Sequence, residues 1–252
     1  MCRHLAYLGP PRSLARLLLD PPRGLYEQSW APRRQTHGVV NADGFGFGWY
    51  PPDGDGEPAR YRRALPIWAD PNVPELARAI RSGAVLAAVR SATAGTAPDE
   101  AAAAPLRDGR FLFSHNGAIP DWTRLPVDLG DESGLDAAAL LSLEARSDSA
   151  LLWALIALRL RRGEPADRAV AEVLRAIAAV RPTARLNVLL TDGESILATR
   201  HGDTLWYRAT RGEVLVASEP DDEERDHPWH EVPDRSLLPA TVGAGVREAV
   251  RI

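Results

Sequence analysis

The amino terminus of this 252-residue chain carries its single cysteine, Cys2, directly after the initiator methionine. Initiator methionine is normally removed before a small residue such as cysteine, so we expect the mature chain to begin with Cys2. A terminal cysteine carries a thiol and an α-amine on one carbon, with reference pKa values of about 8.5 and about 7.7–8.0. The amine can take the thiol proton near neutral pH, which predicts a nucleophile for amide hydrolysis. The alternative is an incidental cysteine, buried as a small apolar side chain.

An Asn-Gly pair at the end of a predicted strand offers a second reactive arrangement. Asn116 and Gly117 follow the apolar run 111–115. An Asn carboxamide and a neighbouring backbone N–H can converge on one point, as the stabilisation of a developing oxyanion requires. Loss of one such donor typically costs about 2.7–4 kcal/mol of transition-state stabilisation. A plain Asn-Gly turn is the alternative interpretation.

Two further segments carry groups that could bind a charged substrate. Arg90 closes the predicted strand 85–89, where its guanidinium could grip a substrate carboxylate through two parallel hydrogen bonds. Thr93, in the same Arg-Ser-Ala-Thr run, could add a hydroxyl to that group. Asp148 lies at a predicted helix start and could bind a substrate ammonium. The alternatives are a surface ion pair for Arg90 and an ordinary helix cap around Asp148.

Composition excludes several other chemistries. All 30 basic residues are arginine, which rules out Schiff-base catalysis, a lysine general base and a Walker-type phosphate loop. Cys2 and His4 share a strand face, and His227 and His230 lie close in sequence, but neither pair has further ligands at a recognisable metal spacing. The glycines of 44–48 lack the third glycine and the following helix of a dinucleotide fingerprint. We therefore expect no metal and no other cofactor.

Charge and hydropathy also limit the partners and the compartment. A net charge of −4 argues against nucleic acid, because binding to phosphates needs a basic surface. The longest apolar run, 150–158, is too short to span a bilayer, and the amino terminus lacks the apolar core of a secretory signal. A single cysteine cannot form an internal disulfide, so we expect a cytoplasmic protein. The sequence leaves open whether the chain forms a homo-oligomer.

The sequence pattern predicts the strands and helices that must position these residues. Strands are expected at 3–8, 44–50, 85–89, 111–115, 186–191, 195–200, 205–209 and 214–218, with Asp192-Gly193 as a hairpin signal. Helices are expected at 14–19, 74–82, 136–144, 147–160 and 166–180, and surface loops at 51–58 and 219–226. Strands, then helices, then strands indicate an α+β sandwich of two antiparallel sheets covered by helices.

The full set of motifs resembles the class II glutamine amidotransferases, which are N-terminal-nucleophile hydrolases. In order and spacing, the resemblance rests on Cys2, Asn41-Ala42-Asp43-Gly44 with Gly46, Gly48 and Trp49, Arg90-Ser91-Ala92-Thr93, His115-Asn116-Gly117 and Ser147-Asp148-Ser149. It implies a four-layer αββα sandwich formed by a single domain over residues 2–252. It also implies that Cys2 is the nucleophile and its own amine the base. The Asn116 side chain and the Gly117 N–H would form the oxyanion hole.

The same resemblance implies how a substrate is held. Arg90, with Thr93 beside it, would take the α-carboxylate of a γ-glutamyl group, and Asp148 would take its α-ammonium. Asp43 and the glycines around it would be architectural. Ala94 stands where many glutamine-using members carry histidine, which weighs against ordinary glutamine as the substrate.

Within that family, the chain is similar to the γ-glutamyl hydrolases of ergothioneine biosynthesis. The similarity covers M-C-R-H-L at the start and the segments 31–38, 184–187, 202–205 and 217–220. It implies hydrolysis of γ-glutamyl-hercynylcysteine S-oxide to glutamate and hercynylcysteine S-oxide, with that small molecule as the partner. Two alternatives stay open: a stand-alone glutaminase subunit that delivers ammonia to a synthetase partner, and a non-enzymatic relative that keeps the fold as a binding module.

Overall fold

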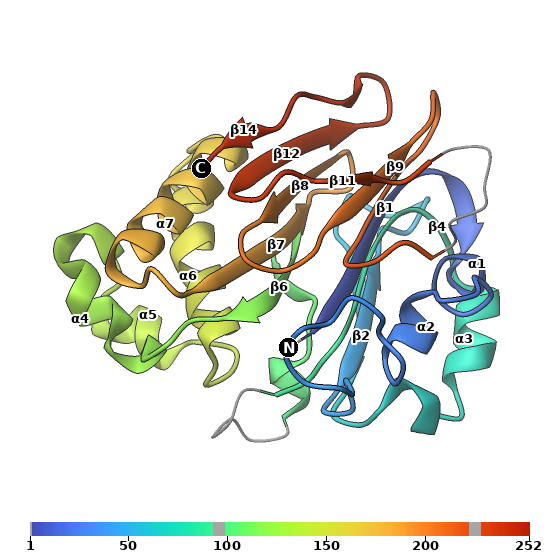
Figure 1. The fold of residues 1–252 in the computed structure, drawn as a ribbon, viewed down its shortest axis with the longest axis horizontal. Coiled ribbons are helices and arrows are strands. Elements are labelled where there is room, and N and C mark those ends of the chain that lie inside the picture. The colour runs from blue at the N-terminus through green and yellow to red at the C-terminus, as the bar shows by residue number, and fades with distance from the viewer. Residues whose placement is uncertain (1, 93–98, 222–227) are drawn as a thin grey trace.

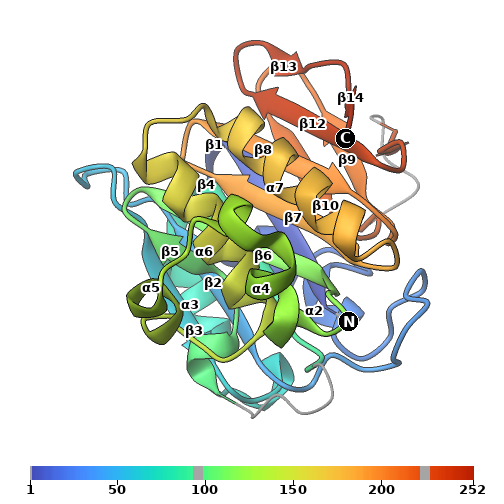
Figure 2. The same cartoon turned by 90° about the vertical axis from the view of Figure 1, so that its left-hand side faces the viewer.

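Two antiparallel sheets lie face to face between two layers of helices in the computed structural model, which describes residues 2–92, 99–221 and 228–252 (Figure 1). The helices are α1 (Leu14–Leu18), α2 (Leu25–Gln28), α3 (Val73–Ala79), α4 (Leu125–Leu129), α5 (Ala137–Leu141), α6 (Asp148–Arg161) and α7 (Ala166–Val180), with short 3₁₀ turns at Ile67–Ala69, Glu100–Ala102, Trp122–Arg124 and Gly130–Ser133. Helices α1–α3 lie on one side of the strands and α4–α7 on the other, where α4, α6 and α7 face the viewer in Figure 2. In the described part of the chain, no helix is long and apolar enough to cross a membrane.

Over the described residues, each sheet has seven strands joined in antiparallel pairs. Sheet A has the order β11 (His230–Glu231), β9 (Trp206–Ala209), β10 (Val214–Ala217), β1 (Arg3–Ser13), β4 (Arg81–Val89), β2 (Phe45–Trp49) and β3 (Ala59–Arg63). Sheet B has the order β13 (Gly245–Val246), β12 (Ser236–Thr241), β8 (Ser195–Arg200), β7 (Arg185–Thr191), β6 (Phe111–Ala118) and β5 (Leu106–Asp108), and β14 (Val250–Arg251) pairs with β12. The predicted αββα sandwich is confirmed, with β1 at the centre of sheet A.

The side chains of β1 contribute to two separate buried clusters. Leu5 and Tyr7 belong to the apolar cluster under α1–α3, whereas Ala6 and Leu8 belong to the cluster between the sheets. This is the two-residue period of a strand that is buried on both faces. The strand that begins beside Cys2 is therefore held from both sides.

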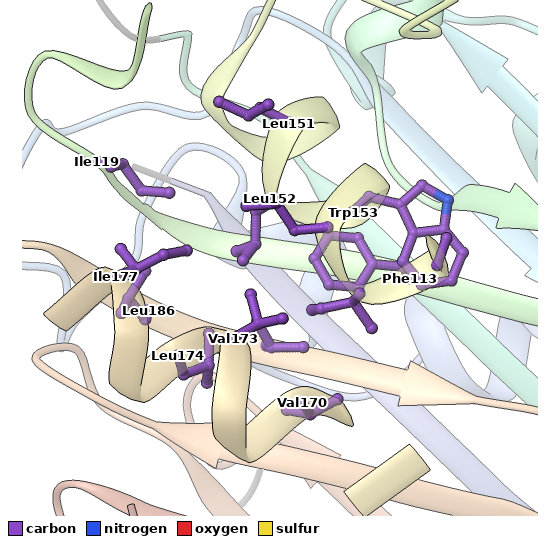
Figure 3. Close-up of a cluster of buried hydrophobic side chains, with 14 of the residues drawn as sticks. Phe113, Ile119, Leu151, Leu152, Trp153, Val170, Val173, Leu174, Ile177 and Leu186 are labelled. Atoms are coloured by element: carbon purple, nitrogen blue, oxygen red, sulfur yellow. The ribbon is translucent and has the colours of Figure 1, made fainter. Parts of the chain in front are cut away.

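A third cluster fills the space between sheet B and its helices (Figure 3). The ring of Phe113 on β6 stacks on that of Trp153 on α6, with the two centroids 4.9 Å apart. Helix α7 contributes a row at helical spacing, namely Val170, Val173, Leu174 and Ile177. Helix α6 begins as predicted, because the Ser147 hydroxyl accepts a hydrogen bond from the Ala150 nitrogen at 3.2 Å. This cap sets the position of Asp148, the first residue of the helix.

Glycine alternates with aromatic residues along β2, and the two kinds face different layers. Phe45 and Phe47 are buried in the cluster under α1–α3. On the other face, a Cβ on Gly46 would lie 2.4 Å from the carbonyl oxygen of Ala104, and one on Gly48 would lie 2.7 Å from a side chain of β6. The two glycines therefore permit a close approach of the neighbouring layer that no other residue would allow.

Most of the predicted strands and helices are confirmed, with shifts of a few residues at their ends. The Asp192-Gly193 hairpin is confirmed between β7 and β8, where Asp192 Oδ1 accepts hydrogen bonds from both the nitrogen and the hydroxyl of Ser195. The first strand, however, does not end at Leu8 as predicted. It runs to Ser13, and its pairing with β4 shifts register after Leu8, so an irregularity absorbs the Gly-Pro-Pro segment. The sequence pattern did not predict β3, β5 or β11–β14.

The prediction of a surface loop at 219–226 is wrong for its first residues. Glu219 and Asp221 are 2% and 4% exposed. Glu219 Oε1 lies 3.2 Å from Nε of Arg3, which is also fully buried, and Asp221 pairs with Arg208. These carboxylates are buried because each has an arginine partner. Residues 222–226 lie outside the described residues.

We expect Gly46→Ala to lower the free energy of unfolding by about 1–3 kcal/mol, because its Cβ would overlap a backbone oxygen that cannot move alone. Urea denaturation measures the loss. Gly212→Ala is the matched control, since a Cβ there would meet nothing within 4 Å. Equal stability of both variants would contradict the close approach at β2.

Candidate active site

Cys2 immediately precedes β1, at the end of sheet A where β4 also ends. Its neighbour Arg3 pairs with Val89, the last residue of β4. The Cys2 nitrogen donates a hydrogen bond to Asn116 Oδ1 at 3.1 Å, and the Cys2 thiol lies 3.9 Å from the Ser91 carbonyl oxygen. Cys2 therefore lies between the two sheets, within reach of the motifs on β4 and β6.

Burial raises the pKa of the Cys2 thiol above its ordinary value. The positive charge of the amino terminus, the hydrogen bond to Ser91 and the charge of Arg90 lower this pKa, whereas the charge of Asp148 raises it further. The thiol is therefore protonated at neutral pH, and its attack requires a base. Arg90 and Asp148 both lie within electrostatic reach of the sulfur.

Asn116 belongs to β6 of the opposite sheet and is fully buried. Its Oδ1 accepts the hydrogen bond from the Cys2 nitrogen, and its Nδ2 donates to the Ser218 hydroxyl at 3.4 Å. Because a carboxamide nitrogen carries two N–H groups, one of them remains for a ligand beside Cys2.

Gly117 continues β6 in a position that only glycine fits. A Cβ at this residue would lie 2.0 Å from the carbonyl oxygen of Arg185, and its φ is +157°. Asn116 pairs with Asn187 and Gly117 with Leu186 of β7. The two residues are thus part of a strand, and the alternative of a plain Asn-Gly turn is wrong.

Arg90 follows β4 directly and is 8% exposed. Its Nη1 donates to the Asp43 carbonyl oxygen at 3.2 Å, and the Asp43 nitrogen donates to the Arg90 carbonyl oxygen at 2.9 Å. The Asp43 carboxylate accepts a hydrogen bond from the Ala92 nitrogen at 2.8 Å. Asp43 therefore stabilises the turn after β4. The bond from Arg90 Nη1 to the Asp43 carbonyl oxygen uses one of the five N–H donors of the guanidinium. Thr93 and Ala94 lie outside the described residues.

Asp148 is 5% exposed, and backbone N–H groups hold its carboxylate. One oxygen accepts from the Ile119 nitrogen at 3.0 Å and the other from the Ser149 nitrogen at 2.9 Å. A carboxylate offers about four acceptor sites, so it keeps capacity for a substrate ammonium. Ser147 caps the helix, so the Asp148 carboxylate is not needed as the helix cap.

His115 is a residue of the site to which the sequence assigned no role. With Cys2, Arg90 and Ser149 it lines a cavity of about 20 Å³, the size of a single water. His115 Nε2 lies 2.9 Å from the Arg185 carbonyl oxygen, which only accepts, so the proton is on Nε2. Nδ1 then accepts from the Ser149 hydroxyl at 3.0 Å. The signal for this residue was its place in the His-Asn-Gly run beside the oxyanion candidate.

The cavity beside Cys2 is not lined by His4, His37, His201 or His230 of the described residues. His4 Nδ1 lies 3.1 Å from the Ser114 hydroxyl, and burial lowers the pKa of His4 well below its ordinary value, so its ring is neutral. His230 lies on β11, His37 is exposed in the loop after α2, and His227 is outside the described residues. Across the described ranges, no group of three or more His, Cys, Asp or Glu side chains is placed to hold a metal ion.

Two facing antiparallel sheets between layers of helices form the fold that solved class II glutamine amidotransferase structures share with this chain. The model of the class-II glutamine amidotransferases matches residues 25–212, and the chain belongs to this family.

Two relatives and one solved structure extend the comparison. The gamma-glutamyl-hercynylcysteine sulfoxide hydrolase of Mycolicibacterium smegmatis is 45% identical over 238 residues, which cover 94% of this chain and 95% of that protein. The protein of the same name from Mycobacterium tuberculosis is 41% identical over 242 residues, 96% of this chain and 93% of that protein. A glutamine aminotransferase class-II domain protein from Silicibacter pomeroyi shares the fold, with a TM-score of 0.67, 24% identity and coverage of 98% of this chain and 97% of that one.

Alkylation of the thiol as a function of pH tests the charges around Cys2. We expect Asp148→Asn to react with iodoacetamide at lower pH than the wild type, because loss of a negative charge lowers the pKa of the Cys2 thiol. Arg90→Met should shift the profile to higher pH for the opposite reason. Mass spectrometry follows the label without ambiguity, since the chain has one cysteine. Shifts in the same direction for both variants would contradict the argument.

Proposed function

We propose that this chain is an amidohydrolase that cleaves the γ-glutamyl amide of γ-glutamyl-hercynylcysteine S-oxide, a step of ergothioneine biosynthesis, in the cytoplasm. Relatives that carry this activity in their names match nearly the whole chain at 45% and 41% identity. The observation that carries the proposal is the hydrogen bond between the Cys2 nitrogen and Asn116 Oδ1. It supports the proposal because the nitrogen of the candidate nucleophile's own residue lies beside the carboxamide that we propose as an oxyanion donor.

Attack requires that Met1 is removed and that the α-amine of Cys2 is free. In the chain with Met1, the Cys2 nitrogen that donates to Asn116 Oδ1 is a peptide amide. After Met1 is removed, the same contact would hold one N–H of the α-amine and leave the nitrogen lone pair to accept the thiol proton. Burial keeps the thiol protonated until then. The thiolate forms as sulfur attacks the γ-carbonyl carbon, and the carbonyl oxygen takes up the negative charge.

This oxyanion requires hydrogen-bond donors that are already in place. The second N–H of Asn116 Nδ2 and the backbone N–H of Gly117 are the proposed donors, each contributing about 2.7–4 kcal/mol. The carbon–nitrogen bond then breaks, and the leaving amine takes its proton from the Cys2 α-ammonium. Water, with the free amine again as base, hydrolyses the γ-glutamyl thioester, releases glutamate and restores Cys2.

Arg90 and Asp148 account for the choice of the γ-glutamyl group. Both are buried. The charge of Arg90 lowers the pKa of the Cys2 thiol and the charge of Asp148 raises it, so both lie near the same sulfur. The α-carboxylate of the substrate would pair with Arg90 and its α-ammonium with Asp148. A substrate that lacks either group leaves one buried charge unpaired and is penalised in the transition state.

The purified chain, assayed alone, is expected to release glutamate from γ-glutamyl-hercynylcysteine S-oxide much faster than from glutamine. Cys2→Ala should lower this rate by at least about a thousandfold, as loss of a nucleophile does elsewhere. Glutamate release is measured by chromatography. Preference for glutamine would favour the ammonia-delivering subunit instead, and no turnover of either substrate would favour a binding module.

A second expected outcome concerns the terminal amine itself. An amino-terminal extension that a site-specific protease can remove should abolish turnover, because the Cys2 nitrogen is then an amide without a basic lone pair. Cleavage that leaves Cys2 as the first residue should restore activity, with the new terminus verified by intact mass. If the extended chain turned over substrate as fast as the chain that begins with Cys2, the proposed mechanism would be wrong.

A further inference from the structure

Ser218 lies outside the motifs that define the reaction centre, yet its side chain contacts that centre directly. It follows β10, opposite His4 on β1, and is fully buried. Its hydroxyl accepts a hydrogen bond from the His4 nitrogen at 3.0 Å and another from Asn116 Nδ2 at 3.4 Å. The same hydroxyl lies 3.4 Å from the His4 carbonyl oxygen, to which it donates.

These three contacts use the full capacity of a hydroxyl group. A serine side chain has one O–H donor and two acceptor lone pairs. The His4 carbonyl oxygen can only accept, so its contact with the hydroxyl assigns the Ser218 proton to it, and the hydroxyl then meets Asn116 as an acceptor. The group that it accepts from must therefore be the NH₂ end of the Asn116 carboxamide, as observed.

This restriction matters because the two ends of the Asn116 carboxamide have opposite polarity. In the observed orientation Oδ1 faces the Cys2 nitrogen and Nδ2 carries the N–H that is left for an oxyanion. A flipped carboxamide would present its oxygen to the developing negative charge and its NH₂ group to the amine of Cys2. Either change would oppose the reaction.

Ser218 is itself held by the backbone around it. Its nitrogen donates to the His4 carbonyl oxygen at 3.0 Å, and its carbonyl oxygen accepts from the Thr204 hydroxyl at 2.9 Å. The loop that carries Thr204 is organised by Asn187, whose side chain bonds the backbone of His201, Asp203 and Thr204. The position of the Ser218 hydroxyl is thus set by β1, β7 and β10 together.

We propose that Ser218 is a positioning residue that orients the Asn116 carboxamide, with Oδ1 toward the Cys2 amine and Nδ2 toward the oxyanion. This inference rests on the proposed function for its kinetic consequence, but the orientation itself is a property of the resting protein. The Ser218–Asn116 contact is long, so its loss should cost less than the loss of Asn116.

The kinetic test is a double-mutant cycle on γ-glutamyl amide hydrolysis. Ser218→Ala should lower kcat by about tenfold, the worth of a hydrogen bond, with little change in KM because Arg90 and Asp148 are untouched. In the Asn116→Ala background the same substitution should lower kcat by less than about threefold, since the group that it acts on is gone. A full tenfold loss in both backgrounds would overturn the proposal.

Ser114→Ala is the matched control. Ser114 is also fully buried and bonds the side chain of His4, not Asn116. We expect it to lose stability while it keeps a kcat near the wild-type value. An equal loss of kcat in Ser114→Ala would assign the effect of Ser218 to general loosening around His4 and refute the proposal. If Ser218→Ala does not fold, Ser218→Cys, whose sulfur is a weaker acceptor at similar volume, replaces it in the cycle; its smaller loss of kcat should disappear in the Asn116→Ala background, and a loss that persists there would overturn the proposal.

A second measurement does not depend on turnover. In isotope-edited NMR, the side-chain NH₂ protons of Asn116 should exchange slowly with solvent in the wild type and faster in the Ser218 variant. Unchanged exchange would refute the positioning role even if the chain proved inactive on every γ-glutamyl amide. Inactive wild-type protein with the expected exchange difference would instead count against the proposed function alone.

Discussion

The hydrogen bond from the Cys2 nitrogen to Asn116 Oδ1 joins two sheets whose described strands form no ladder with each other. Cys2 precedes the central strand of sheet A, and Asn116 lies on β6 of sheet B, so their separation is set by the packing between the sheets. That packing comes from apolar side chains such as Ala6 and Leu112. Since a misplacement of about 1 Å can cost a hundredfold in rate, the core between the sheets contributes to the chemistry as well as to stability.

Two glycines near the site permit close backbone approaches. Gly46 and Gly117 each meet a backbone oxygen where a Cβ would stand, at 2.4 Å and 2.0 Å. Each is located where one strand or segment passes closest to another. A side chain at Gly46 would push away the segment that leads into β5, whereas one at Gly117 would disturb the pairing of β6 with β7 inside sheet B. The alternating glycines of the sequence thus have a steric cause that periodicity alone does not reveal.

Local sequence was sufficient for the residues that lie at the ends of recognisable elements. Arg90 follows an apolar strand, Asn116 follows the apolar run 111–115 within β6, and Asp148 opens a capped helix, so pattern and motif order located all three. Local sequence was insufficient for residues whose surroundings come from distant segments of the chain. Glu219 lies among other acidic residues in the sequence and was expected at the surface, but it is buried in an ion pair with Arg3. Strand β3, with the sequence Ala-Arg-Tyr-Arg-Arg, lies at a sheet edge and shows no apolar alternation.

Ser218 illustrates the same limit at the reaction centre. It is separated from His4 by 214 residues, and its hydroxyl is indistinguishable in the sequence from that of any serine after a strand. Its effect arises because a buried polar group must find partners, and the three groups within reach admit one arrangement of donors and acceptors. An apolar contact would tolerate rotation of the Asn116 carboxamide, since dispersion does not distinguish oxygen from nitrogen. A saturated hydrogen-bond network does distinguish them, which is why the end of the sandwich that carries Cys2 is polar while the clusters behind it are apolar.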